Sequence, residues 1–331
     1  MNVTLYRVFG HIGRLSQRAT PKWWRLKVAA LLVLAALSIP ERAQAEAAKL
    51  YVFGNSLIYH ASETEKTSVP YWLGYLAKRN GETLQLDGQW GFMRNFAKDL
   101  PPNPQWGFSN VQSAWRRGTR DLADNGYTHV MFNPANFIQY QGAEVPYDGE
   151  NPTGESPLST AIDLFQKLPN NEIILYEGWA DLAAFSSRFP PRDRPLRKYH
   201  AFNAGDYHDW HVDFAEALQQ EFPQSNITLL PVARILSRAF TETGLKDLEA
   251  TDIYLDDAPH GTKDLYFLAS VPVYVQLFGS LPSAVDVPAE VHPLIKAHFA
   301  DFLAIIEEEV SVEQASAVVP VPAQPVKQET K

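Results

Sequence analysis

The chain alternates short apolar runs with longer stretches of helical periodicity. Apolar side chains that recur every three or four residues predict helices, and these stretches are residues 69–81, 156–169, 206–223 and 262–279. Short apolar runs bounded by Gly, Pro or Asn predict strands, and these runs are residues 49–54, 83–88, 129–133, 172–178 and 227–236. Such alternation predicts an α/β protein, with a mainly parallel five-stranded sheet between two layers of helices.

The region before this alternation has the pattern of an export signal. Residues 1–27 contain six Lys and Arg and no acid, residues 28–40 are almost entirely apolar, and Ala43 and Ala45 form a small-x-small site. This order is typical of a signal peptide spanning residues 1–45. An uncleaved N-terminal anchor is the alternative, although the apolar run is shorter than the roughly 20 residues of a membrane span. Both interpretations predict a periplasmic or secreted protein.

One uninterrupted domain is expected over residues 47–309. Residues 310–331 are rich in Pro, Val, Ala and Gln and show no periodicity. That composition predicts a disordered tail, because it offers too little regular apolar surface to bury.

Composition narrows the classes of function. The 331 residues include no Cys, which excludes disulfides, a thiolate nucleophile and Cys-ligated zinc. With residues 1–45 set aside, 22 Lys and Arg face 37 Asp and Glu, a formal charge of −15. This charge argues against nucleic acid or an anionic membrane surface as a partner. Membrane contact is expected only through an uncleaved N-terminus.

Ser56 follows the first predicted strand, in the stretch YVFGNSLIYH. Ligands of parallel α/β sheets bind beyond the carboxyl ends of the strands, so Ser56 is predicted at that edge. Its hydroxyl could cap a following helix or act as a nucleophile. A nucleophilic serine needs a base, and an acid that orients the base.

Such a pair occurs before the last long helix, in Asp257-Ala258-Pro259-His260. In a tight loop, Asp257 could bond one imidazole nitrogen of His260 and leave the other nitrogen facing Ser56. Asp256 is a neighbouring carboxylate, four residues from His260. An Asx-type turn with a surface histidine is the structural alternative.

The Gly-x-Ser-Leu sequence at the first strand and the D-x-x-H sequence near the end of the domain together resemble the SGNH (GDSL-type) hydrolase superfamily. The resemblance covers residues 49–280 in order and spacing. It implies a flavodoxin-like three-layer α/β/α sandwich, with Ser56 as nucleophile, His260 as base and Asp257 as orienting acid. Asn55 replaces the aspartate of the GDSL sequence.

The resemblance also implies two donors for an oxyanion hole. Gly91 in LDGQWGF fits the family glycine after the second strand, with Gly88 as the alternative. Asn136 in FNPANF fits the family asparagine after the third strand, with Asn133 as the alternative. This third block lacks the Gly and Asp that the family often has. Preplaced N–H donors stabilise the negative oxygen of a tetrahedral intermediate, and losing one costs about 3 kcal/mol.

The sequence contains other polar residues that are candidates for a functional site. His208 and His211 lie three residues apart on a predicted helix with acids beside them, a pattern that could bind a metal; a solvated helix face is the favoured interpretation. Glu177 ends the fourth predicted strand. It could line a substrate site or pair with an arginine.

The sequence therefore predicts an exported serine esterase or O-acyltransferase that needs no metal or organic cofactor. The expected substrate is an acylated small molecule or polysaccharide, with O-acetyl as the expected group. Water or a sugar hydroxyl could release the acyl group, so hydrolase and transferase are both open. A non-catalytic glycan-binding or assembly protein on the same scaffold is the alternative, because a fold does not dictate an activity.

Overall fold

A computed structural model describes residues 47–60, 64–96, 98, 106–120, 122–134, 141–168 and 172–317. The predicted export signal, residues 1–45, lies outside these ranges. Within them, no helix combines the length and the apolar character needed to cross a membrane.

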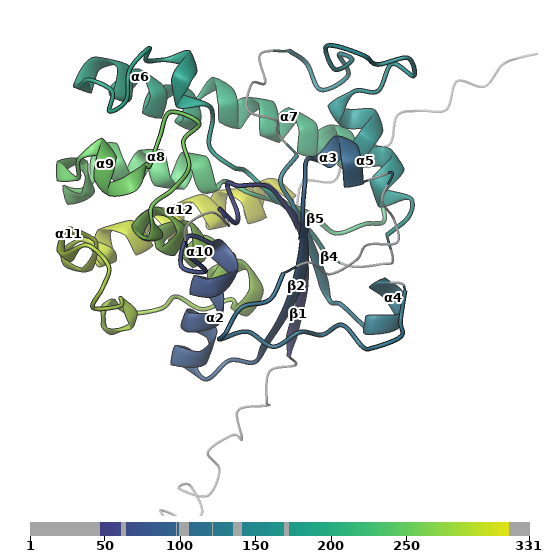
Figure 1. The fold of residues 1–331 in the computed structure, drawn as a ribbon, viewed down its shortest axis with the longest axis horizontal. Coiled ribbons are helices and arrows are strands. Elements are labelled where there is room, and N and C mark those ends of the chain that lie inside the picture. Colours follow the sequence, from purple (N-terminus) through teal and green to yellow (C-terminus); the bar gives the residue numbers. More distant parts are fainter. Residues whose placement is uncertain are drawn as a thin grey trace, which may run out of the picture. The chain divides into compact units, whose positions relative to one another are not determined.

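The centre of the molecule is one sheet of five parallel strands (Figure 1). The strands are β1 (Ala48–Gly54), β2 (Leu84–Trp90), β3 (His129–Phe132), β4 (Glu172–Tyr176) and β5 (Ile227–Leu230). Their spatial order is β2-β1-β3-β4-β5, the order of flavodoxin-like folds. This confirms the predicted α/β class, and every pairing is parallel. Because β1 pairs with both β2 and β3, the residues that follow β1 lie at the carboxyl edge between the ends of those two strands.

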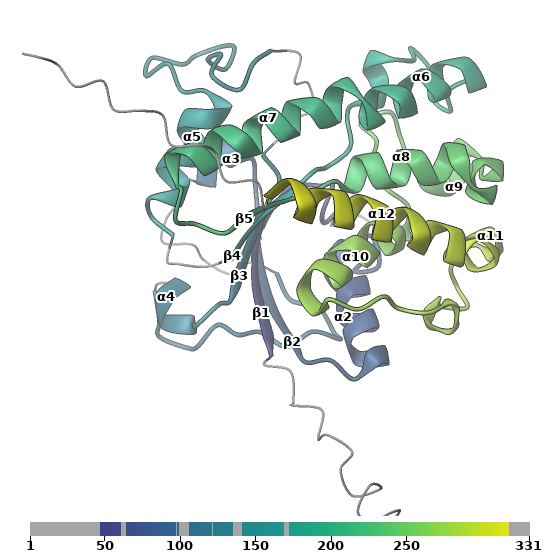
Figure 2. The same cartoon turned by 180° about the vertical axis from the view of Figure 1, so that it is seen from behind.

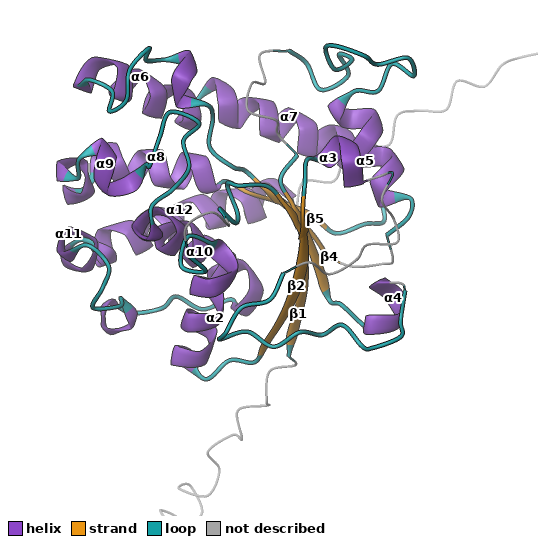
Figure 3. Cartoon of the chain, in the orientation of Figure 1, coloured by secondary structure: helices purple, strands orange, loops and turns teal. Residues whose placement is uncertain are grey.

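Helices cover both faces of the sheet (Figures 1, 2 and 3). Successive side chains of a strand point to opposite faces, so Leu50 and Val52 enter one core while Tyr51 and Phe53 enter the other. The first face is covered by α2 (Val69–Asn80), α6 (Asp193–Ala204), α8 (Val232–Glu242), α9 (Ala250–Ile253), α10 (Lys263–Phe278), α11 (Pro293–Ala297) and α12 (Phe299–Ala317). The second face is covered by α3 (Met93–Phe96), α4 (Leu122–Asn125), α5 (Pro157–Phe165) and most of α7 (Asp206–Glu221).

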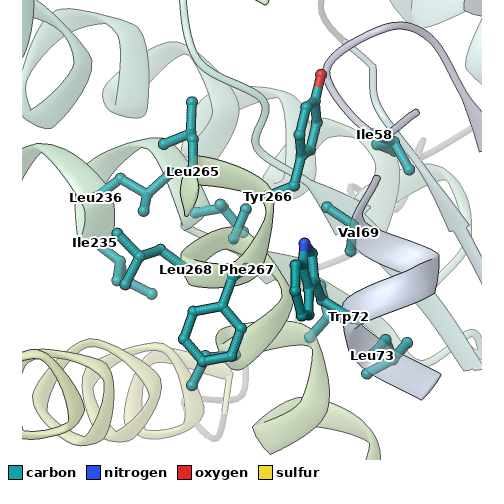
Figure 4. Packing of buried hydrophobic residues seen from close by; sticks show 14 of the residues in the cluster. Ile58, Val69, Trp72, Leu73, Ile235, Leu236, Leu265, Tyr266, Phe267 and Leu268 are labelled. Atoms are coloured by element: carbon teal, nitrogen blue, oxygen red, sulfur yellow. The ribbon is translucent and has the colours of Figure 1, made fainter. Parts of the chain in front are cut away.

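Helix α10 lies at the centre of the first face, and Figure 4 shows its packing against α2. The Trp72 ring meets Phe267 edge to face, with centroids 5.6 Å apart, and its indole N–H donates to the Lys66 carbonyl at 2.8 Å. Both rings are fully buried. A helix that is apolar on nearly all sides is stable only when surrounded. The core therefore anchors α10, and with it the loop that precedes α10 and contains His260.

The C-terminal boundary differs from the prediction. Helix α12 continues to Ala317, through residues that were assigned to the tail. Residues 311–317 contain no Gly or Pro, and the first proline after them is Pro320. Ser, Glu, Gln and Ala tolerate a helix that is already nucleated and packed, so the helix extends past the end of the apolar pattern.

Candidate active site

Ser56 lies in a tight turn directly after β1. The Asn55 carbonyl accepts the N–H groups of Ile58 and Tyr59, both at 3.0 Å. The Asn55 side-chain oxygen accepts the Leu57 N–H, also at 3.0 Å. Such an Asx-type turn needs only a short side-chain acceptor, which accounts for an asparagine at the position where the family motif has aspartate.

The helix-cap interpretation of Ser56 is wrong. The turn does not continue into a helix, and α2 begins only at Val69. The residue that caps α2 is Ser68, whose hydroxyl accepts the Tyr71 N–H at 3.3 Å. Ser56 therefore gains no field from a helix N-terminus.

The surroundings of Ser56 hold its backbone and leave its hydroxyl without a partner. Ser56 is 6% exposed. Its carbonyl accepts a hydrogen bond from the Tyr266 hydroxyl on α10, which in Figure 4 points away from the core toward the turn that contains Ile58. Across the described residues, neither the hydroxyl nor the N–H of Ser56 takes part in a hydrogen bond. Both groups are thus available to a bound molecule.

His260 is held by Asp256. The Asp256 Oδ2 lies 2.6 Å from His260 Nδ1, and Oδ1 accepts the N–H groups of His260 and Ala258 at 3.0 and 3.1 Å. A carboxylate can only accept, so Nδ1 bears the hydrogen. Partial burial alone would raise the Asp256 pKa, but the hydrogen bonds from His260 outweigh it, and the net pKa is lowered.

Asp257 does not occupy the position that the D-x-x-H spacing predicted. Its side chain is exposed, and its carbonyl accepts the Ala183 N–H at 3.0 Å. The loop closes through the Leu255 N–H, which donates to the His260 carbonyl at 2.7 Å. That closure turns the Asp256 carboxylate toward the imidazole and the Asp257 carboxylate toward solvent, so the pairing with Asp257 is corrected to Asp256.

His60, which the sequence analysis did not single out, stacks on His260. The two rings are 4.0 Å apart between centroids and 10° from parallel. The His60 backbone is held by Thr67, whose carbonyl accepts the His60 N–H at 3.0 Å and whose hydroxyl donates to the His60 carbonyl at 2.8 Å. The position of His60 four residues after Ser56 was the available signal, although nothing in the pattern linked it to His260.

The Ser56 turn and the His260 loop are therefore neighbours at two points. Tyr266 contacts the Ser56 carbonyl, and His60 covers the His260 ring. Among the described residues, the Ser56 hydroxyl and His260 are not hydrogen-bonded to each other. Catalytic hydrogen bonds often tighten only when substrate binds.

Gly91 is not positioned as an oxyanion donor. Its N–H donates to the Gly54 carbonyl at 2.9 Å and so extends the pairing of β2 with β1. Gly88, the alternative, lies inside β2 opposite Val52, where a Cβ would meet Trp106 at 2.4 Å. Close packing thus accounts for Gly88, and the predicted role of Gly91 is corrected, because its N–H is already used.

Two asparagines follow β3 in the sequence. Asn136 lies outside the described residues, whereas its alternative Asn133 is described and buried. A Cβ at Gly178 would lie 2.4 Å from the Asn133 Nδ2 and 2.9 Å from Leu57. The Asn133 amide therefore lies beside the turn that contains Ser56.

The Glu177 carboxylate is hydrogen-bonded to two helices. It is fully buried directly after β4, with His208 Nδ1 2.7 Å from its Oε2 and the Arg234 N–H donating to its Oε1 at 3.0 Å. Burial raises the Glu177 pKa, and the contact with His208 offsets part of that rise. The carboxylate thus joins α7 to the first turn of α8.

The histidines of α7 face inward, which corrects the expectation of a solvated face. His208 and His211 are both buried, and His211 Nδ1–H donates to the Tyr207 carbonyl at 2.8 Å. Over the described ranges, no three His, Asp or Glu side chains are grouped as a metal site would require.

Buried histidines make the stability of the protein dependent on pH. Burial lowers the pKa of His200 to about 4 and that of His211 to about 3, both below the 6.5 of an unfolded chain. The unfolded chain therefore binds more protons below pH 6.5, so stability present above pH 6.5 is lost as the pH falls toward 4. Between pH 6.5 and its own lowered pKa, each histidine should lower the free energy of unfolding by about 1.4 kcal/mol per pH unit.

Urea unfolding at pH 7.5 and pH 5.0 measures this loss. His211→Gln, which does not titrate, should lose less stability between the two pH values than the wild-type protein. An equal loss in both proteins would contradict the assignment to His211.

Comparison with known proteins adds one distant similarity. No protein-family model and no curated protein matches this chain. Among solved structures, a family 3 carbohydrate esterase of Clostridium thermocellum is similar at 13% identity and a TM-score of 0.37. The match covers 69% of this chain and 94% of that one. At this identity and TM-score, the comparisons establish neither a family nor an activity.

Proposed function

We propose that this protein is an exported serine esterase or O-acyltransferase that forms an acyl-enzyme on Ser56. The observation that supports this most directly is the Asp256–His260 pair, packed through His60 and Tyr266 against the turn that contains Ser56. These contacts bring the segments that contain Ser56 and His260, about 200 positions apart in the sequence, next to each other, and serine catalysis needs a hydroxyl, a base and an acid in one place.

The proposed reaction gives Ser56, His260 and Asp256 distinct roles. Ser56 Oγ attacks the acyl carbon, and its proton passes to His260 Nε2, because Nδ1 already donates to Asp256. Asp256 keeps this tautomer and stabilises the imidazolium that forms. Collapse of the tetrahedral intermediate breaks the ester C–O bond, and the leaving alcohol takes the proton from His260. Water or a second hydroxyl then repeats the sequence on the acyl-enzyme.

Two donors are proposed for the oxyanion. The Ser56 N–H has no intramolecular acceptor in the described structure, and the Asn133 amide lies beside the same turn. Donors held in place before the reaction stabilise developing charge without reorganisation.

His60 is proposed to position His260. Its ring lies parallel to the base at 4.0 Å, and its backbone is tied to Thr67. Asp256 restrains the imidazole in its plane and His60 restrains it from one face, so Nε2 keeps its direction during proton transfer.

Fluorophosphonate labelling tests the proposal. The mature protein, residues 46–331, should form a covalent adduct, and peptide mapping should locate it on Ser56. His260→Ala should slow labelling strongly, because the base no longer activates the hydroxyl. Absence of an adduct, together with absence of p-nitrophenyl acetate turnover, would instead support the non-catalytic glycan-binding alternative.

A further inference from the structure

Trp90 is exposed at the edge that contains Ser56. It is 45% exposed, whereas Trp72, Trp106 and Trp179 are at most 8% exposed. Burying an aromatic ring removes a large apolar area from water and is favourable. An exposed tryptophan at the end of a strand therefore lacks part of that stabilisation, and its apolar surface is accessible to a ligand.

The strand pairing sets the distance from Trp90 to Ser56. Trp90 is the last residue of β2 and is paired in register with Gly54, two residues before Ser56. Neighbouring strands are about 4.8 Å apart and two extended residues span about 7 Å, so the two backbones lie within roughly 10 Å. The Gly91 N–H, bound to the Gly54 carbonyl at 2.9 Å, holds this end of β2 against β1.

A second ring braces the indole. Phe92 meets Trp90 edge to face, with centroids 5.5 Å apart and planes at 72°. Such a contact restrains an exposed ring at little entropic cost, because an aromatic side chain has only two rotatable angles. The exposed indole is thus a restrained flat surface.

Carboxylates lie beside His260. Asp256 binds His260, and Asp257 is exposed next to it in the sequence. Burial raises the pKa of Asp181, and the nearby charges of Asp257 and Asp256 raise it further. A negatively charged ligand would meet repulsion here, whereas an uncharged one would not.

We propose that Trp90 stacks on the pyranose ring of an uncharged sugar whose ester group lies at Ser56. This assignment rests on the proposed function and names its substrate class. The C–H face of a pyranose matches the apolar face of an indole, while the sugar hydroxyls at the ring edge stay in water.

Equilibrium binding tests the stacking without any need for turnover. Xylohexaose, which is uncharged and has no ester, should bind the wild-type protein and quench its tryptophan fluorescence. Trp90→Ala should weaken this binding about tenfold, and Trp90→Phe should retain most of it. Val285→Ala is the control, since Val285 is 70% exposed in a short helix, Ala284–Asp286, which contacts Arg79 in the last turn of α2. Unchanged binding in Trp90→Ala would overturn the proposal.

Kinetics separate this proposal from the proposed function. With O-acetylated xylo-oligosaccharide, Trp90→Ala should raise KM about tenfold with little change in kcat, and the loss of kcat/KM should be smaller on p-nitrophenyl acetate, which has no sugar ring to stack. An equal loss on both substrates would indicate a structural role and overturn the sugar assignment. Failure of the wild-type protein to turn over either ester would overturn the proposed function, and the binding experiment would still decide the role of Trp90.

The binding of a neutral and an anionic oligosaccharide tests the preference for an uncharged sugar. Hexagalacturonate, an anionic oligosaccharide of the same length, should bind at least about tenfold more weakly than xylohexaose at low salt. Asp257→Asn should narrow that difference. Equal binding of the two oligosaccharides by the wild-type protein would contradict the preference for an uncharged sugar.

Discussion

Replacing Ser56 with alanine should lower the kcat of ester hydrolysis by roughly a millionfold, the scale on which loss of a serine nucleophile acts in other hydrolases. The change removes the only atom that forms the acyl-enzyme in the proposed reaction. It should leave the fold intact, because the Ser56 hydroxyl makes no hydrogen bond with any described residue.

The rate should be measured with p-nitrophenyl acetate, beside the Ser68→Ala variant as a matched control. Ser68 is a buried serine nearby in sequence, and its hydroxyl caps α2. Loss of this cap should cost about 1 kcal/mol of stability and leave turnover of the remaining folded protein unchanged. If Ser56→Ala retained wild-type turnover, Ser56 could not be the nucleophile.

Asp256→Asn should lower kcat/KM by roughly ten-thousandfold, whereas Asp257→Asn should change it by less than about threefold on the same small ester. An amide at position 256 can donate to Nδ1, which favours the wrong imidazole tautomer. Asp257 makes no contact with His260 in the described structure, and its side chain is exposed.

These two variants differ by one position and by the same chemical change, so each controls for the other. The reverse order of effects would restore Asp257 as the orienting acid and contradict the observed pairing.

The class of fold could be predicted because it depends on local periodicity. The alternation of strands and helices, read over residues 49–279, predicts the five parallel strands that the structure contains. Ser56 and His260 could be proposed for a different reason, because the Gly-x-Ser-Leu and D-x-x-H sequences resemble those of a serine hydrolase superfamily. Boundaries were less predictable: α12 reaches Ala317 through residues that lack a regular apolar pattern but contain no Gly or Pro to end the helix.

The choice between neighbouring residues could not be made from the sequence. Asp256 and Asp257 are chemically identical and adjacent, so only the backbone of the loop decides which carboxylate meets His260. Gly91 fits a motif, yet its N–H is already bound to the Gly54 carbonyl. Both outcomes depend on hydrogen bonds between segments, which leave no periodic signal along the chain.

The sequence by itself determined the sheet, its two helical layers and the edge at which Ser56 lies, because these follow from the spacing of apolar residues along one chain. Only the tertiary structure decided that His60 stacks on His260, that Asp256 is the carboxylate bound to His260, that Asn133 borders the turn and that Trp90 is exposed. Those relations join residues from different strands and loops, and the physical reason they escape the sequence is that packing sets them across space.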